Sequence, residues 1–178
     1  MNALTVPTRD NVSAANQALF DNLKKGLGFV PNLYATLAHS ETALGTYLTL
    51  QNSKTSLNGK ESEIVNLVVS QVNGCNYCLA AHTALGKIKG FTDAQMLEIR
   101  SGKATFDAKL GALAELVQDI AVSRGHPDAA RVEAFYAAGY TPGHLVDVIV
   151  LVGDKTVSNY LHGATGVVID FPAAPALA

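Results

Sequence analysis

The sequence predicts an all-α fold, and two observations carry this prediction. Apolar residues recur with helical spacing along almost the whole chain of 178 residues, and no segment of comparable length alternates as a strand does. Hydrophobic residues make up 48% of the chain and charged residues 16%, which is enough apolar material for a core and too few charges for a disordered protein. The length is typical of one domain, so we expect a single domain over residues 1–178.

The predicted helices follow one another with recognisable start signals. Asn58, with Glu61 three residues later, predicts a capping box for the third helix. Thr92 caps the fifth helix, and Pro142 suits the first position of the eighth. The expected helices cover residues 11–27, 33–50, 58–73, 76–87, 93–101, 107–123, 128–138 and 141–163, and an extended, proline-containing tail follows over about residues 167–178.

Two parts of the chain resemble each other. Residues 57–78 are similar to residues 140–161, because each segment reads as a capped apolar helix that ends in Asn-Tyr. Only the first segment carries cysteines, and Ser158 and Leu161 stand at the corresponding positions of the second. The similarity indicates a duplicated helical unit with one chemically active copy, although short helical segments also resemble each other by chance.

The chain has only two cysteines, Cys75 and Cys78, which lie together as Cys-x-x-Cys. In a reducing compartment such a pair is typical of catalysis, redox sensing or metal binding. At about 100° per residue, both cysteines and His82 share one face of their helix, and His82 lies one turn after Cys78. Gly74 places Cys75 at a helix N-terminus, where free N–H groups and the helix dipole favour a thiolate.

The helix before the cysteines is almost wholly apolar. Its polar residues form one narrow stripe at helical spacing, namely Glu63, Asn66, Ser70 and Asn73. A carboxylate buried on such a helix needs a partner, which an imidazole or an ordered water beside the thiols would provide. Glu63 taken alone has the simpler interpretation of a solvated residue near the start of a helix.

Zinc binding is the sharpest competing interpretation of these residues. Cys75, Cys78 and His82 supply three possible ligands, with Glu63 or His162 as a fourth. A second cysteine pair is lacking, and the helix N-terminus offers no zinc knuckle, so we expect no metal. The sequence has no Gly-x-Gly-x-x-Gly segment either, and we expect no bound nucleotide cofactor.

The pattern Glu-x11-Cys-x-x-Cys-x3-His, at Glu63, Cys75, Cys78 and His82, resembles the AhpD-like alkylhydroperoxidases of the carboxymuconolactone decarboxylase superfamily. The resemblance extends over nearly the whole chain, because segments near both ends are similar to the family and to its peroxidase-related subgroup. These segments are residues 28–32, 37–40, 159–162 and 169–172.

The resemblance implies an AhpD-like helical bundle that forms a homo-oligomer, such as a dimer, trimer or hexamer. It implies that Cys78 is the peroxidatic cysteine, which becomes a sulfenic acid, and that Cys75 is the resolving cysteine and proton donor. His82 corresponds to the base that activates the thiol, and Glu63 to a relay residue behind it.

One position departs from the family pattern. The best-studied members carry a second histidine two residues after the first cysteine, where this chain has Tyr77, a poor base at neutral pH. Tyr77 and His162 are therefore secondary candidates for the site, although His162 is better explained as a structural or interface residue.

The resulting prediction is a thiol-dependent peroxidase. A hydroperoxide is reduced while Cys75 and Cys78 form a disulfide, and an external dithiol, either a small molecule or a protein, regenerates them. The alternatives are a dithiol–disulfide oxidoreductase or redox sensor without strong peroxidase activity, a non-redox decarboxylase-like or lactone-processing enzyme, and a non-catalytic scaffold or metal-binding module.

Charge and hydropathy limit the partners. The formal net charge is −2 and no basic cluster exceeds Lys24-Lys25, so a nucleic-acid partner is not expected. The mean hydropathy of +0.19 is high, but no run approaches the roughly 20 apolar residues of a membrane span. An apolar surface used for self-association is the better interpretation. The N-terminal ten residues lack a signal-peptide pattern, and we expect a cytoplasmic protein.

Overall fold

The structure is a computed structural model that describes residues 4–177. Within this range the chain forms nine α-helices and one short 3₁₀-helix and contains no strand, which confirms the predicted all-α fold. Residues 1–3, part of the N-terminal segment used for the localisation prediction, and Ala178 at the end of the predicted tail lie outside the described residues.

The chain divides into two compact units. The first comprises the residues up to Ser53 together with Leu161–Asp170, and the second comprises Lys54–Tyr160 together with the segment from Phe171 onward. The single domain expected over the whole chain stays a prediction. Each unit has its own cluster of buried apolar side chains.

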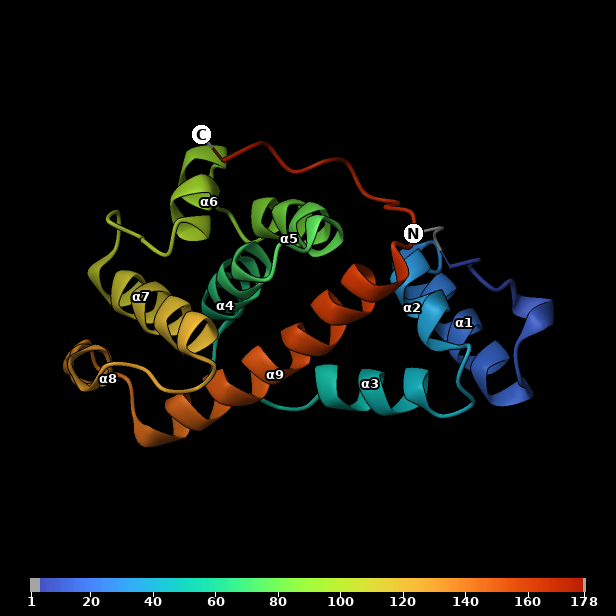
Figure 1. Ribbon diagram of the computed structural model, residues 1–178, viewed down its shortest axis with the longest axis horizontal. Helices are drawn as coiled ribbons and strands as arrows, with labels where there is room; N and C mark the ends of the chain where they lie inside the picture. The colour runs from blue at the N-terminus through green and yellow to red at the C-terminus, as the bar shows by residue number, and fades with distance from the viewer. Residues whose placement is uncertain (1–3, 178) are drawn as a thin grey trace. The chain divides into compact units, whose positions relative to one another are not determined.

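The first unit is built from short helices. It contains the 3₁₀-helix Arg9–Asn11 and the helices α1 (Ala14–Leu27), α2 (Asn32–Leu37) and α3 (Ala43–Gln51). Helix α3 contacts both α1 and α2 (Figure 1). The buried apolar residues of this unit are Phe20, Ala35, Ala38 and Leu44.

The single helix predicted over residues 33–50 is wrong, because the chain leaves the helix between α2 and α3. Asn16, a buried residue of α1, donates from Nδ2 to the carbonyl oxygens of Ala38 and Ser40 at 3.2 and 2.9 Å. These carbonyls therefore have partners outside a helix, as buried backbone groups require. The Ser40 hydroxyl then accepts from the amide of Ala43 and helps to start α3.

The second unit contains the predicted cysteine site. It consists of α4 (Gly59–Val72), α5 (Asn76–Ile88), α6 (Asp93–Arg100), α7 (Ala108–Ser123), α8 (Ala129–Ala137) and the part of α9 (Pro142–Thr165) up to Tyr160. Helix α4 contacts α5, α6 and α7 and lies among them (Figure 1). Fully buried side chains hold this unit together, including Ile64, Val65, Leu67 and Val68 of α4, Leu113, Leu116 and Val117 of α7, and Val148 of α9.

The predicted start signals of this unit are confirmed. The Asn58 side chain accepts from the amide of Glu61, and the Glu61 carboxylate accepts from the amide of Asn58. Thr92 forms a second capping box with Gln95. Gly74 separates α4 from α5 with a φ of +64°, a conformation that residues with a side chain rarely adopt. The break leaves Cys75 at the start of α5.

The predicted extended tail is also present in the described residues. Among the described residues no helix follows α9, and the part of the tail from Phe171 onward passes alongside α5 and reaches α6 (Figure 1). Two contacts hold its last part to the second unit. The ring of Phe171 packs edge-on against Tyr77 with centroids 5.7 Å apart, and Arg100 donates from Nη1 to the Pro175 carbonyl at 2.6 Å.

Candidate functional site

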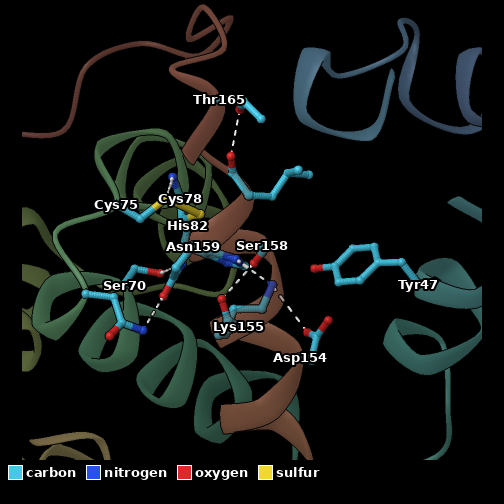
Figure 2. The surroundings of a disulfide bond; sticks show 12 residues. Tyr47, Ser70, Cys75, Cys78, His82, Asp154, Lys155, Ser158, Asn159 and Thr165 are labelled. Atoms are coloured by element: carbon cyan, nitrogen blue, oxygen red, sulfur yellow. Dashed lines mark hydrogen bonds and ion pairs between the residues drawn. A yellow bond between two sulfur atoms is a disulfide. The ribbon is translucent and has the colours of Figure 1, made fainter. Parts of the chain in front are cut away.

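The two cysteines form a disulfide at the N-terminus of α5 (Figure 2). Their Cα atoms are 5.4 Å apart. Cys75 is the N-cap of the helix, and its Sγ accepts from the amide of Cys78 at 3.2 Å. Helix amides of this kind stabilise negative charge on sulfur once the disulfide is reduced. Only 1% of Cys75 and 3% of Cys78 is exposed, so a reactant must pass covering side chains to reach either sulfur.

Glu63 and His82 lie together behind the disulfide, as the sequence predicts. Glu63 lies on α4 and His82 on α5, one turn after Cys78, and both are buried. His82 Nδ1 lies 2.9 Å from Glu63 Oε2, and Asn66 donates from Nδ2 to Glu63 Oε1 at 3.3 Å. Burial by itself raises the pKa of the Glu63 carboxyl, but the charge and hydrogen bond of His82, with Asn66 and the charge of Lys155, outweigh it and lower that pKa below 4.5.

Lys155 of α9 is the residue of this site that sequence reasoning missed. Its Nζ lies 3.3 Å from His82 Nε2 and 3.3 Å from Asp154 Oδ2 (Figure 2). Lys155 is 3% exposed and Asp154 is 2% exposed, and charged side chains are buried to this extent only when they are paired. The available signal was an Asp-Lys pair inside a long helix that is otherwise rich in apolar residues.

These contacts fit one tautomer of the His82 ring. A protonated lysine can only donate, so Nε2 of His82 accepts from Lys155. Nδ1 then carries the proton and donates to Glu63. The two contacts therefore suit the tautomer with the proton on Nδ1 and the accepting nitrogen facing the lysine.

The polar stripe of α4 finds further partners on α9. Asn159 donates from Nδ2 to the hydroxyl of Ser70 at 3.3 Å, and Asn73 donates from Nδ2 to Asn159 Oδ1 at 3.0 Å. Ser158 donates to the backbone carbonyl of Lys155 at 3.0 Å. These bonds join α4 and α9 within the second unit and fix the segment that carries Lys155.

The two secondary candidates have different surroundings. Tyr77 is buried and packs against Phe171, so its ring helps to hold the tail over α5. His162 belongs to the first unit and not to the unit that holds the cysteines. Burial lowers the pKa of the His162 imidazole, against an opposing hydrogen bond with the backbone of Val167. Across residues 4–177, no group of three or more histidine, cysteine, aspartate or glutamate side chains has the arrangement of a metal site.

The arrangement is suited to two-electron thiol chemistry. Two sulfurs close enough to form a disulfide can give up two electrons together, and a neighbouring imidazole can move the proton of a thiol. None of the helices among the described residues is both long and apolar enough to span a membrane.

Comparisons with known proteins agree with the predicted family and fold. The Carboxymuconolactone decarboxylase family matches residues 37–118, a segment that includes Glu63, both cysteines and His82. None of the curated proteins compared matches the chain.

Three solved structures show an AhpD-core-like fold over most of the chain. An uncharacterized peroxidase-related protein from Silicibacter sp. TM1040 is 22% identical, with a TM-score of 0.79, and the match covers 93% of this chain and 90% of that one. An uncharacterized peroxidase-related protein from Ralstonia eutropha JMP134, described as an alkylhydroperoxidase AhpD core, is 20% identical, with a TM-score of 0.84 and coverage of 94% and 92%. A cysteine-to-alanine variant of the debrominase Bmp8 in complex with 2,3,4-tribromopyrrole is 14% identical, with a TM-score of 0.77 and coverage of 96% and 93%.

Proposed function

We propose that this chain, whose residues 37–118 match the carboxymuconolactone decarboxylase family, is a thiol-dependent peroxidase that reduces hydroperoxides. The observation that carries the proposal is a disulfide between Cys75 and Cys78 at a helix N-terminus, with the buried Glu63–His82 pair behind it. This combination provides electrons, a setting that favours a thiolate, and a base.

The proposed reaction begins with the reduced protein. The thiolate of Cys78 attacks one peroxide oxygen, the O–O bond breaks, and the alkoxide leaves as an alcohol after it takes the proton removed from the thiol. Cys78 becomes a sulfenic acid. The thiol of Cys75 then attacks this sulfur, so that the disulfide forms and the hydroxyl group leaves with a proton as water. One peroxide is reduced to an alcohol and water for every two thiols oxidised.

Regeneration requires a dithiol from outside the chain. An external dithiol attacks the disulfide, forms a mixed disulfide, and leaves as its own disulfide when both cysteines are reduced. We propose that the reductant is a small molecule or another protein, because the chain has no further cysteines to store electrons. A compartment that supplies dithiols fits the cytoplasmic location expected from the sequence.

The test is peroxide consumption by the reduced protein, compared with Cys78→Ser and Cys75→Ser, with free thiols counted by mass spectrometry. We expect the wild type to consume one peroxide per pair of thiols and to form the disulfide within one chain. Cys78→Ser should be inert, and Cys75→Ser should stop at the sulfenic acid. An inert Cys75→Ser beside a reactive Cys78→Ser would reverse the two roles.

Further arms of the same assay separate the alternative functions. Thiols that ignore peroxide but exchange rapidly with disulfides indicate an oxidoreductase or redox sensor. Loss of bromide from 2,3,4-tribromopyrrole, the ligand in the Bmp8 complex, would indicate a reductive debrominase with the same electron source. Activity on a lactone or carboxylate substrate that persists in both cysteine variants would favour the non-redox decarboxylase chemistry of the family name.

We also propose that the chain forms a homo-oligomer. Exposed apolar side chains follow one face of α9 within the second unit, at the spacing of a single helical stripe; they are Val146, Ile149, Val150, Val157 and Tyr160. Light scattering should give the mass of a dimer, trimer or hexamer. Ile149→Asp should reduce this mass, and an unchanged mass would exclude the stripe as the contact surface.

A further inference from the structure

The positive charge of a lysine in the protein interior needs partners, and one partner of Lys155 is His82, the base of the proposed reaction. The groups that face the His82–Lys155 contact come from three helices. Glu63 comes from α4 and Asp154 from α9 itself, and the disulfide of Cys75 and Cys78 lies at the start of α5, one turn before His82. The cluster thus holds two buried carboxylates and one ammonium group. Direct contacts link Glu63 to His82, His82 to Lys155, and Lys155 to Asp154.

The contact between His82 and Lys155 joins two nitrogens, so it holds one proton between them. With Glu63 accepting from Nδ1–H, that proton belongs to the ammonium of Lys155, which donates it to Nε2. The lysine therefore selects one tautomer of the ring. It also opposes a second proton on the imidazole, because a protonated ring would place two positive charges 3.3 Å apart.

We propose that Lys155 is a positioning residue for the cysteine chemistry: it fixes the tautomer of His82 and provides the positive charge that allows Cys78 to ionise in this buried cluster. The inference rests on the proposed function only in naming Cys78 as the thiol that must ionise. Lys155 acts through His82 and through its charge, and it does not react with the peroxide.

Charge balance is the physical reason for the proposal. When the disulfide is reduced, ionisation of Cys78 adds a negative charge to a cluster that already holds the carboxylates of Glu63 and Asp154. The ammonium of Lys155 offsets one of these charges. Without it, the thiolate would form beside two carboxylates in an environment of low dielectric constant, where like charges strongly disfavour further ionisation.

The test is the rate of alkylation of Cys78 by iodoacetamide as a function of pH, in reduced protein with Cys75→Ser so that one thiol remains. The rate follows the fraction of thiolate. We expect Lys155→Gln, which keeps an N–H donor but loses the charge, to move the midpoint of this profile upward by about one pH unit or more. Lys155→Arg, which keeps the charge, should restore the midpoint to within a few tenths of a unit.

A matched control uses another lysine of the helix that carries the thiol. Lys87 lies on α5, as Cys78 does, but it is exposed and pairs with Asp93. Lys87→Gln should leave the midpoint in place. If Lys155→Gln fails to fold because Asp154 is left unpaired, Asp154→Asn tests the same charge balance from the other side. This variant keeps the ammonium and removes one of the two carboxylates, so the midpoint should fall, and a midpoint that stays in place or rises would overturn the inference.

A midpoint that stays in place or falls in the Lys155→Gln protein overturns the inference. A fall would mean that the lysine competes with Cys78 for Nε2 of His82 instead of supporting the thiolate. Alkylation needs no peroxide, so this test is separate from that of the proposed function. A protein that consumes no peroxide but shows the upward shift would retain the inference and lose the peroxidase proposal.

Discussion

Replacement of Glu63 by glutamine tests whether the buried carboxyl group of Glu63 is ionised. The substitution preserves the size of the side chain but removes its charge. Both carboxylate oxygens of Glu63 accept a hydrogen bond, one from His82 Nδ1–H at 2.9 Å and one from Asn66 Nδ2 at 3.3 Å. A glutamine has one accepting oxygen and one donating nitrogen, so it can satisfy His82 only by turning its amide toward Asn66.

The expected cost is about 2 kcal/mol in the free energy of unfolding at pH 7, because hydrogen bonds to charged groups contribute roughly 1.5–3 kcal/mol each and one neutral bond is retained. Asn66 limits the loss. Its Oδ1 has no hydrogen-bond partner in the described part of the chain, so a rotation of the Asn66 amide would place this oxygen against the glutamine nitrogen. A cost above about 4 kcal/mol would mean that this rotation does not occur, because two donors would then face each other.

The pKa of Glu63 determines how its contribution to the free energy of unfolding changes with pH. The pKa of Glu63 in the folded protein lies below its ordinary value of 4.5, so the unfolded chain takes up the proton first as the pH falls. The stabilisation by Glu63 is therefore complete above about pH 4.5 and is lost as the pH falls through the lower folded pKa.

Urea unfolding of both proteins, at pH 7 and at several values below 4.5, measures the difference. The two free energies of unfolding should converge as the pH falls. A difference that stays constant over this range would refute the conclusion that the carboxylate is charged in the folded protein. Glu133→Gln is the matched control, because Glu133 is exposed on α8, and its effect should lie within about 0.5 kcal/mol at every pH.

Three further predictions concern access and stability. Phe171→Ala removes the ring that packs on Tyr77, and it should speed reduction of the disulfide by dithiothreitol severalfold without changing the wild-type far-UV circular dichroism. Gly163→Ala should raise the free energy of unfolding by about 1 kcal/mol, since a Cβ there meets no atom within 4 Å; a destabilised variant would mean that another chain covers this position. Asn58→Ala removes the cap shared with Glu61 and should cost about 1 kcal/mol by urea unfolding.

The sequence was sufficient to predict the helices whose ends are determined by neighbouring residues. The capping box at Asn58, the cap at Thr92 and the break at Gly74 are local, and each was confirmed. The break after α2 was missed because its cause is a distant residue. Asn16 holds two carbonyls of this loop from another helix, and no local pattern reveals such a contact.

The same distinction explains what was predicted of the candidate site. His82 and the cysteines share one helix, so their spacing was enough to bring them together. Glu63 required the inference that an almost wholly apolar helix buries its polar stripe, and the contact with His82 is confirmed. Lys155 lies 73 residues after His82, on α9, and only the packing of this helix within the second unit brings the two side chains together.

The similarity between residues 57–78 and 140–161 acquires a physical meaning from the backbone. In the first segment Gly74 takes up a φ of +64° and ends α4, so a new helix begins at the cysteines. The corresponding position of the second segment is Val157, whose branched side chain strongly disfavours that conformation, and α9 continues through it without a break. Ser158 therefore has no helix N-terminus behind it and donates to a carbonyl of its own helix. An unbroken helix cannot form a second reactive pair of this kind, but it can place Asn159 against Ser70 of the first segment and Lys155 against His82, one turn after Cys78.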